Sequence, residues 1–128
     1  MAQIVSHNPA SVHAPSSSYS MGLELGQHRL LLFVSGQVPE ESDGSVPDGF
    51  EAQCEQAWRN VIAVLAAAGL GVEHLVKINT FLTDRSQVVA NRAIRRKMLG
   101  GHEPASTVMI AETVDGEWLL EIEGIAAE

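Results

Sequence analysis

Cysteine and positively charged residues are both scarce in this sequence. Cys54 is its one cysteine, so the chain can form no disulfide bond within itself and has no cysteine pair for a zinc site. Only 8 residues are Lys or Arg against 16 Asp or Glu, and the formal net charge is −8. Binding to a phosphate backbone needs clustered positive charge, so we expect no nucleic-acid partner.

Long apolar runs are also missing. No uninterrupted stretch approaches the ~20 residues that a membrane-spanning helix needs. The first residues lack a basic segment followed by an apolar one, which is the pattern of a secretory signal. We therefore expect a cytoplasmic protein with no membrane partner, and we take residues 1–128 as a single domain, because this length suffices for one core.

The few basic residues gather in one region. Five of the 8 lie within a short stretch, and they are Arg85, Arg92, Arg95, Arg96 and Lys97. We interpret them as a solvated helix face whose cations complement the helix C-terminus. An anion-binding site or a subunit contact is the alternative interpretation.

Turn residues and hydrophobic periodicity predict the elements of the first half. Residues 1–18 are rich in Ser, Pro, Ala and His and predict an irregular or weakly paired lead-in. Residues 19–25 and 30–36 have the composition of two short strands, which suggests a hairpin. After a polar loop, a helix is predicted from Phe50 to about Gly69. Its apolar residues recur every three or four positions and are Cys54, Trp58, Val61, Ile62 and Leu65.

The second half predicts one more helix between strands. Residues 75–83 alternate in character and predict a strand with two distinct faces. A second helix is predicted from a cap at Asp84, or at the threonine before it, through Met98. Residues 106–111 and 118–126 predict two final strands. The residues expected on the inner side of the second helix are Val89, Ala90, Ala93, Ile94 and Met98.

The predicted elements follow the order ββαβαββ, which is an α+β arrangement. Such an order favours two helices packed on one face of a single mixed sheet. The opposite face of that sheet then needs cover, and another copy of the same chain is the simplest cover. We therefore expect a homo-oligomer.

Several segments in this order resemble one protein family. They are "SYSMG" (18–22), "LLLFVSGQVPE" (30–40), "VKINTFLTD" (76–84), "VVANRAI" (88–94), "PASTVMIA" (104–111) and "LLEIEGIAA" (119–127). Together they are similar to the RidA family, also called YjgF/YER057c/UK114, over nearly the whole chain. The resemblance implies a chorismate-mutase-like fold that assembles as a homotrimer, with small-molecule clefts between neighbouring subunits.

The resemblance also implies a chemistry. The best-known members hydrolyse reactive enamines and imines, such as 2-aminoacrylate and its imine tautomer, to 2-oxo acids and ammonia. A deaminase of this hydrolase type needs no metal and no organic cofactor.

The catalytic residues implied by the resemblance are Glu121 and Tyr19. Glu121 matches the glutamate that positions or activates the attacking water, and Tyr19 matches a tyrosine whose hydroxyl contacts substrate or intermediate. Ala105 stands where these deaminases place an arginine that binds the substrate carboxylate. Alanine cannot form that bidentate pair, so we expect a substrate that differs from the usual 2-imino acids.

Further residues match positions that border the family site, and they are Ser35, Gly36, Asn91, Ser106 and Thr107. His102 and Glu103 precede the altered position and are candidates for contacting a ligand in the arginine's place. Each residue also has an ordinary interpretation as part of a strand, helix surface or loop, and for Glu121 this is a cross-strand pair. Two functions therefore remain open, which are an enzyme acting on a small imine or enamine and a non-catalytic binding or regulatory trimer. Ribonuclease or translation-inhibitor activity, attached to some relatives, is a third possibility that the acidic balance disfavours.

Overall fold

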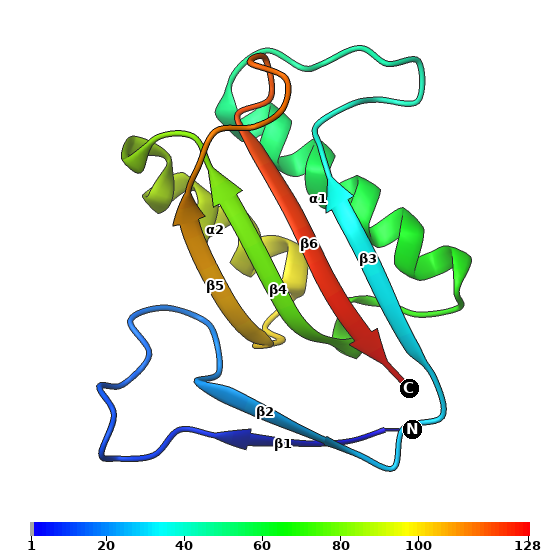
Figure 1. Ribbon diagram of the computed structural model, residues 1–128, viewed down its shortest axis with the longest axis vertical. Coiled ribbons are helices and arrows are strands. Elements are labelled where there is room, and N and C mark those ends of the chain that lie inside the picture. Colours follow the sequence, from blue (N-terminus) through cyan, green and yellow to red (C-terminus); the bar gives the residue numbers. More distant parts are fainter. Residues whose placement is uncertain (1) are drawn as a thin grey trace.

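The computed structural model describes residues 2–128, and both of its helices lie behind a four-stranded main sheet (Figure 1). The elements are β1 (Gln3–His7), β2 (Gly22–Gly26), β3 (Leu31–Gln37), α1 (Phe50–Ala67), η1 (Val72–His74), β4 (Leu75–Leu82), η2 (Arg85–Gln87), α2 (Val88–Leu99), β5 (Ala105–Ile110) and β6 (Leu120–Ala127). The main sheet has the order β3-β6-β4-β5, with β4 and β5 parallel and the other neighbours antiparallel. The predicted α+β arrangement of two helices on a mixed sheet is confirmed.

The N-terminal part differs from the prediction in two ways. Residues 3–7, expected to be irregular or weakly paired, form a regular strand, β1, which pairs antiparallel with β2 in a separate two-stranded sheet. The predicted hairpin between β2 and β3 is wrong, because β3 pairs with β6. The residues just before β3 also contact the last residue of the chain. The Leu30 N–H donates to the Glu128 carbonyl oxygen at 2.9 Å, and the Arg29 guanidinium pairs with the Glu128 carboxylate at 2.6 Å. Strand propensity carries no information about such long-range pairing.

The core lies between the main sheet and the helices. The buried apolar side chains of α1 are Cys54, Ala57, Trp58, Val61 and Leu65. The periodicity predicted all of these except Ala57, and it also predicted Ile62, which is only partly buried. On β4, Ile78 and Leu82 are fully buried, whereas Lys77, Asn79 and Phe81 on the other face are only partly buried. The predicted alternation of this strand is therefore confirmed, and it distinguishes a helix-covered face from an open face.

The helix boundaries follow the predicted signals. Gly69 adopts a left-handed φ of 76° just after α1, and Gly100 does the same at 58° after α2, a conformation that glycine adopts without steric cost. Asp84 begins the turn into α2, where its carboxylate accepts the Ser86 N–H at 2.8 Å.

The buried face of α2 differs from the prediction. Val89 is 77% exposed and Ala93 is also exposed, although both were expected to face inward. The buried residues are Asn91, Ile94, Arg95 and Leu99. Two polar residues face inward because hydrogen-bonding groups meet them there, namely the Cys54 thiol for Asn91 and serine hydroxyls for Arg95. Arg95 therefore does not belong to a solvated helix face.

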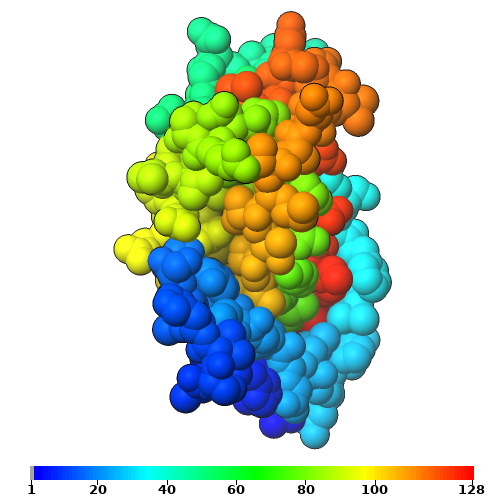
Figure 2. All heavy atoms as spheres, turned by 60° about the vertical axis from the view of Figure 1, so that its left-hand side comes forward, coloured from blue at the N-terminus to red at the C-terminus, as the bar shows by residue number. Residues whose placement is uncertain are grey.

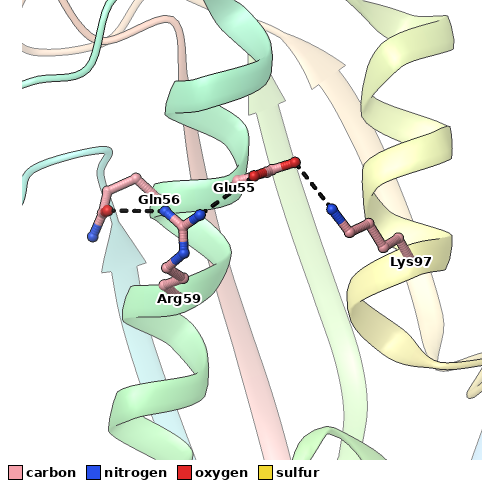
Figure 3. Close-up of polar contacts among 4 residues, drawn as sticks. All are labelled: Glu55, Gln56, Arg59 and Lys97. Carbon is pink, nitrogen blue, oxygen red and sulfur yellow. Dashed lines mark hydrogen bonds and ion pairs between the residues drawn. The ribbon is translucent and has the colours of Figure 1, made fainter.

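Charged side chains join the two helices at the surface (Figure 3). The Glu55 carboxylate lies 3.3 Å from Lys97 on α2 and 3.3 Å from Arg59 one turn along α1. Exposed pairs of this kind contribute about 0–1 kcal/mol each, so the apolar core is what holds the helices to the sheet. None of the helices in residues 2–128 is long and apolar enough to cross a membrane.

The open face of the main sheet faces the viewer in Figure 1 and carries no helix. Apolar side chains are exposed on it, with Phe33 at 69% and Met109 at 56%. Phe33 lies opposite Ile125, and Met109 lies opposite Phe81, so the apolar side chains form two pairs that are separated by a polar row of Glu123, Asn79 and Thr107. Large apolar side chains with this exposure indicate an interaction site.

Candidate active site

Glu121 and Gly36 meet where β3 ends beside β6. The pairing of these strands is irregular between Val34 and Gln37, so the glycine faces β6 out of regular register. A Cβ atom on Gly36 would lie only 1.8 Å from Oε1 of Glu121, which means that the carboxylate occupies the space that any other residue would fill. Glycine is required here for close approach, and the sequence segment "VSGQ" supplies it.

The two glutamates of β6 differ in their hydrogen bonding. Glu123 accepts a hydrogen bond from Nδ2 of Asn79 at 3.1 Å and is thus paired across the sheet. Within residues 2–128, no side chain or backbone group donates to the Glu121 carboxylate, which lies on the open face opposite Phe81. The ordinary interpretation of a cross-strand pair therefore applies to Glu123 and not to Glu121.

Tyr19, Asn91 and Ser106 lie in a cavity of about 180 Å³ between α2, β5 and the segment before β2. Hydrogen bonds fix that segment against the start of β5. The Ser20 N–H donates to the Pro104 carbonyl oxygen at 3.2 Å, and its hydroxyl donates to the Glu103 carbonyl oxygen at 2.7 Å. Figure 2 shows this contact as the blue N-terminal segment lying against α2 and β5.

Asn91 is 1% exposed and is oriented by the thiol of Cys54, which donates to Oδ1 of Asn91 at 3.9 Å. Burial raises the pKa of Cys54 to about 12, and the charges of Glu55 and Glu51 add to this, so the thiol keeps its proton. The second amide atom of Asn91, Nδ2, is buried and has no partner within residues 2–128.

Ala105 and Thr107 lie on the open face of β5, opposite Lys77 and Asn79 of β4. The Lys77 ammonium donates to the Thr107 hydroxyl at 2.9 Å. Lys77 and Asn79 also line a hollow of about 310 Å³ together with Ser35. Lys77 was not among the predicted site residues. It lies two residues before Asn79 on an alternating strand, so both side chains are on the same face of the sheet.

Of His102 and Glu103, the candidate replacements for the arginine, only His102 has its side chain engaged within residues 2–128, because it donates from Nε2 to the Leu75 carbonyl oxygen at 2.6 Å. The backbone carbonyl of Glu103 accepts from the Ser20 hydroxyl, while its side chain is exposed. Of the basic residues on α2, Arg92 and Arg95 line the cavity that holds Tyr19.

The predicted site residues thus form two groups within one chain. Tyr19, Asn91 and Ser106 border the cavity at the edge of β5, on the helix side of the sheet. Glu121 and Gly36 lie on the open face with Ser35, Ala105 and Thr107. Glu121 is not among the residues that line the cavity holding Tyr19.

Comparison with known proteins identifies the family. The family model described as endoribonuclease L-PSP matches residues 10–128. The 2-iminobutanoate/2-iminopropanoate deaminase of Salmonella typhimurium is 30% identical over 123 residues, which cover 91% of this chain and 94% of that protein. The chain belongs to the RidA family. Another RidA relative, protein HMF1 of Saccharomyces cerevisiae, is 30% identical over 119 residues, covering 92% and 90% of the two chains.

Solved structures of the RidA family have the same fold. Escherichia coli TdcF with bound serine has a TM-score of 0.73 at 28% identity, covering 86% of this chain and 87% of that one. The Rid-family protein YyfB of Yersinia pestis, described as of unknown function, has a TM-score of 0.88 at 24% identity and covers 98% of each chain. The second likeness shows the fold alone.

Proposed function

We propose that this RidA-family chain hydrolyses a small reactive imine or enamine in the cytoplasm, with Glu121 directing the attacking water and without a metal or organic cofactor. The observation that carries the proposal is the Glu121 carboxylate lying over Gly36 with no partner of its own among residues 2–128. A carboxylate without a structural partner is free to orient a water and accept its proton. The Salmonella relative is named as an imine deaminase, which supports the same chemistry.

The reaction follows from one base and one water. An enamine substrate first takes a proton on carbon and becomes the iminium ion. The water oxygen then bonds to the iminium carbon, Glu121 takes one proton from that water, and the electron pair of the C=N bond moves to nitrogen, which gives a carbinolamine. Glu121 passes this proton to the amino nitrogen, and the C–N bond breaks with its electron pair leaving on ammonia. The remaining hydroxyl proton passes through the Glu121 carboxylate to solvent as the C=O bond of the carbonyl product forms. The Tyr19 hydroxyl donates a hydrogen bond to the substrate or to this intermediate.

We further propose that the working form is a homotrimer in which each site lies between two copies of the chain. The separation of Tyr19, Asn91 and Ser106 from Ser35, Gly36 and Glu121 supports this arrangement, because one chain does not bring the groups into one cavity. The exposed apolar side chains of the open face supply a surface for a second copy. In that assembly one copy contributes the Tyr19 wall and its neighbour contributes Glu121.

Ammonia release tests the enzymatic proposal. Purified protein is given freshly generated 2-aminoacrylate or a neutral imine, and ammonia formation is compared with the spontaneous rate. Glu121→Gln, which keeps the shape but removes the base, is expected to lower the rate to background. Glu123→Gln is the matched control on the same strand and is expected to retain turnover. Equal rates for wild type and Glu121→Gln would refute the role of Glu121.

A non-catalytic binding or regulatory trimer is the second candidate, and Ala105 is the observation that favours it. Without the arginine at this position the usual carboxylate contact is missing, so a cleft of this kind binds ligand without completing the usual reaction. Ligand that binds only the folded state raises the unfolding temperature by mass action. Stabilisation by a ligand together with no ammonia release from any imine or enamine would favour this function over the enzyme.

A further inference from the structure

Arg95 is a buried cation without an anion. It projects from α2 toward β5 and is 2% exposed. No ion pair among residues 2–128 includes it, and its hydrogen bonds go to the neutral hydroxyls of Ser17 at 2.8 Å and Ser106 at 3.4 Å. A buried charge normally has a counter-charge, because burial removes its hydration at a cost of several kcal/mol. This arginine therefore has the environment of a site whose anion comes from outside the chain.

Arg95 lines a cavity and keeps hydrogen-bond donors that no group in residues 2–128 uses. Of the five N–H donors of a guanidinium, two are engaged by the serines, and the buried Nε atom has no partner within residues 2–128. Asn91, one helical turn before Arg95, lines the same cavity and presents a second buried donor without a partner, Nδ2. Two unpartnered donors at one cavity match a ligand that supplies only acceptor oxygens.

The charge around the cavity is of one sign. Arg92 also lines it, and the other lining residues carry no acidic group: they are Ser16, Ser17, Tyr19, Val88, Ser106 and Val108. Burial, followed by the charge of Arg92, lowers the pKa of Arg95, while Tyr19 acts in the opposite direction. Arginine nevertheless stays protonated at neutral pH, so an anion entering the cavity meets a desolvated positive charge.

We propose that this cavity binds the carboxylate group of a small organic acid, with Arg95 as its cationic anchor and Asn91 and Tyr19 as further donors. The planar guanidinium fork matches a carboxylate in two-point geometry, and a cavity of about 180 Å³ accepts a small acid. The site differs from the arginine position of the related deaminases. Ala105 lies on the open face of β5, whereas Ser106 and Val108 line this cavity on the helix side.

This inference rests on the proposed function where it concerns the reaction of the bound acid, because Tyr19 is part of both the proposed active site and this cavity. It makes the substrate class specific: a small imine or enamine that carries a carboxylate, held by Arg95 and not by position 105. Binding itself requires no turnover, so it is measured independently of the reaction.

The test is titration calorimetry and thermal unfolding with pyruvate, the stable 2-oxo acid, as probe. Pyruvamide is the neutral probe, and inorganic phosphate and sodium chloride at equal ionic strength are the anion controls. Wild type is compared with Arg95→Met, which removes the charge, and with Arg95→Lys, which keeps the charge and loses the fork. Arg96→Met is the matched control on the same helix, where Arg96 donates to the Ser18 hydroxyl at 3.1 Å outside this cavity.

We expect saturable binding of pyruvate by wild type and Arg96→Met, with no response to pyruvamide or sodium chloride. The dissociation constant is expected to rise at least tenfold in Arg95→Met and by a smaller factor in Arg95→Lys. Unchanged affinity in Arg95→Met, or no saturable pyruvate binding by wild type, would overturn the inference. Tighter binding of phosphate than of pyruvate would overturn the choice of carboxylate.

Two further results separate this inference from the proposed function. Glu121→Gln is expected to bind pyruvate with wild-type affinity while losing ammonia release. Arg95-dependent binding in a protein that deaminates nothing would support the inference and refute the enzymatic proposal. Deamination of neutral imines, together with unchanged pyruvate affinity in Arg95→Met, would support the enzymatic proposal and refute this inference.

Discussion

Replacing Gly36 with alanine is expected to remove activity while leaving the protein folded. The new Cβ atom would lie 1.8 Å from Oε1 of Glu121 and 2.7 Å from its Cδ, and ordinary contact begins near 3.4 Å. The obstacle is the end of a flexible side chain, not backbone, so the carboxylate moves aside by more than about 1.5 Å toward the open face. A displaced group of this size lowers the rate of a positioned reaction about 100-fold, which corresponds to about 2.7 kcal/mol of barrier.

The effect on stability is expected to be much smaller. Forcing one side chain out of its preferred rotamer costs about 0.5–1.5 kcal/mol, and the open face offers Glu121 solvent. Guanidinium unfolding should therefore give a free energy of unfolding within about 1.5 kcal/mol of wild type. Gly116→Ala is the matched control, because a Cβ there meets nothing within 4 Å, and it should leave both turnover and stability unchanged.

Two results would refute this reasoning. Full ammonia release by Gly36→Ala would mean that the Glu121 carboxylate is not needed where the structure places it. A loss of several kcal/mol of stability would mean that the contact is with a rigid part of the fold. We expect a loss of stability of this kind for Gly124→Ala, because its Cβ would lie 2.9 Å from the Lys77 carbonyl oxygen, a backbone atom.

Three other predictions follow from the structure. The folded pKa of Cys54, about 12, exceeds its unfolded value of 9.0, so the free energy of unfolding should fall by about 1.4 kcal/mol per pH unit as the pH rises from 9 toward 12. Denaturation of Cys54→Ala should lack this fall, and equal slopes of stability against pH for the two proteins would contradict the prediction. Because Arg95 is proposed to hold the carboxylate from the helix side of β5, Ala105→Arg should give the same kcat/KM for 2-aminoacrylate as Ala105→Lys, which lacks the planar fork, and a gain of about tenfold or more by the arginine would show a bidentate contact at position 105 instead. Phe33→Asp should dissociate the proposed trimer in analytical ultracentrifugation, whereas an unchanged mass would place the interface elsewhere.

Local patterns were sufficient for most of the main sheet and for both helices. The alternation of 75–83 and the three-and-four spacing of α1 depend on which face is buried, and burial leaves a direct record in the sequence. Strand pairing leaves a weaker record. The segments 19–25 and 30–36 looked like a hairpin because they are adjacent, yet β3 pairs with β6 and β2 pairs with the unexpected β1. Those partners are distant in the chain, so short-range signals do not specify them.

The candidate site was predicted in part. The family resemblance named Glu121 and Gly36, and the structure adds the reason that these two belong together, which is the space that a side chain at position 36 would take. It also separates Glu121 from Glu123, whose carboxylate is occupied by Asn79. Such distinctions depend on angles and distances across three strands, which no pattern in a single sequence contains.

Arg95 was predicted only as one member of a cationic cluster, for which anion binding was the alternative to a solvated helix face. A helix with cations at 92, 95, 96 and 97 looks solvated when its charges are counted together, and the apolar pattern pointed to a different inner face. The signal was the spacing of Asn91 and Arg95, four residues apart on one side of the helix, opposite serines at 17 and 106. Aligning this sequence with the family shows only that the arginine is replaced by alanine at position 105. The fold permits a different conclusion, because the helix side of β5 holds a buried guanidinium next to that position, and a carboxylate that approaches from the sheet edge meets it there. We therefore interpret Ala105 as a sign that the substrate carboxylate is held from the helix side of β5 and not from the open face. The substrate is then expected to have a shape that suits this direction.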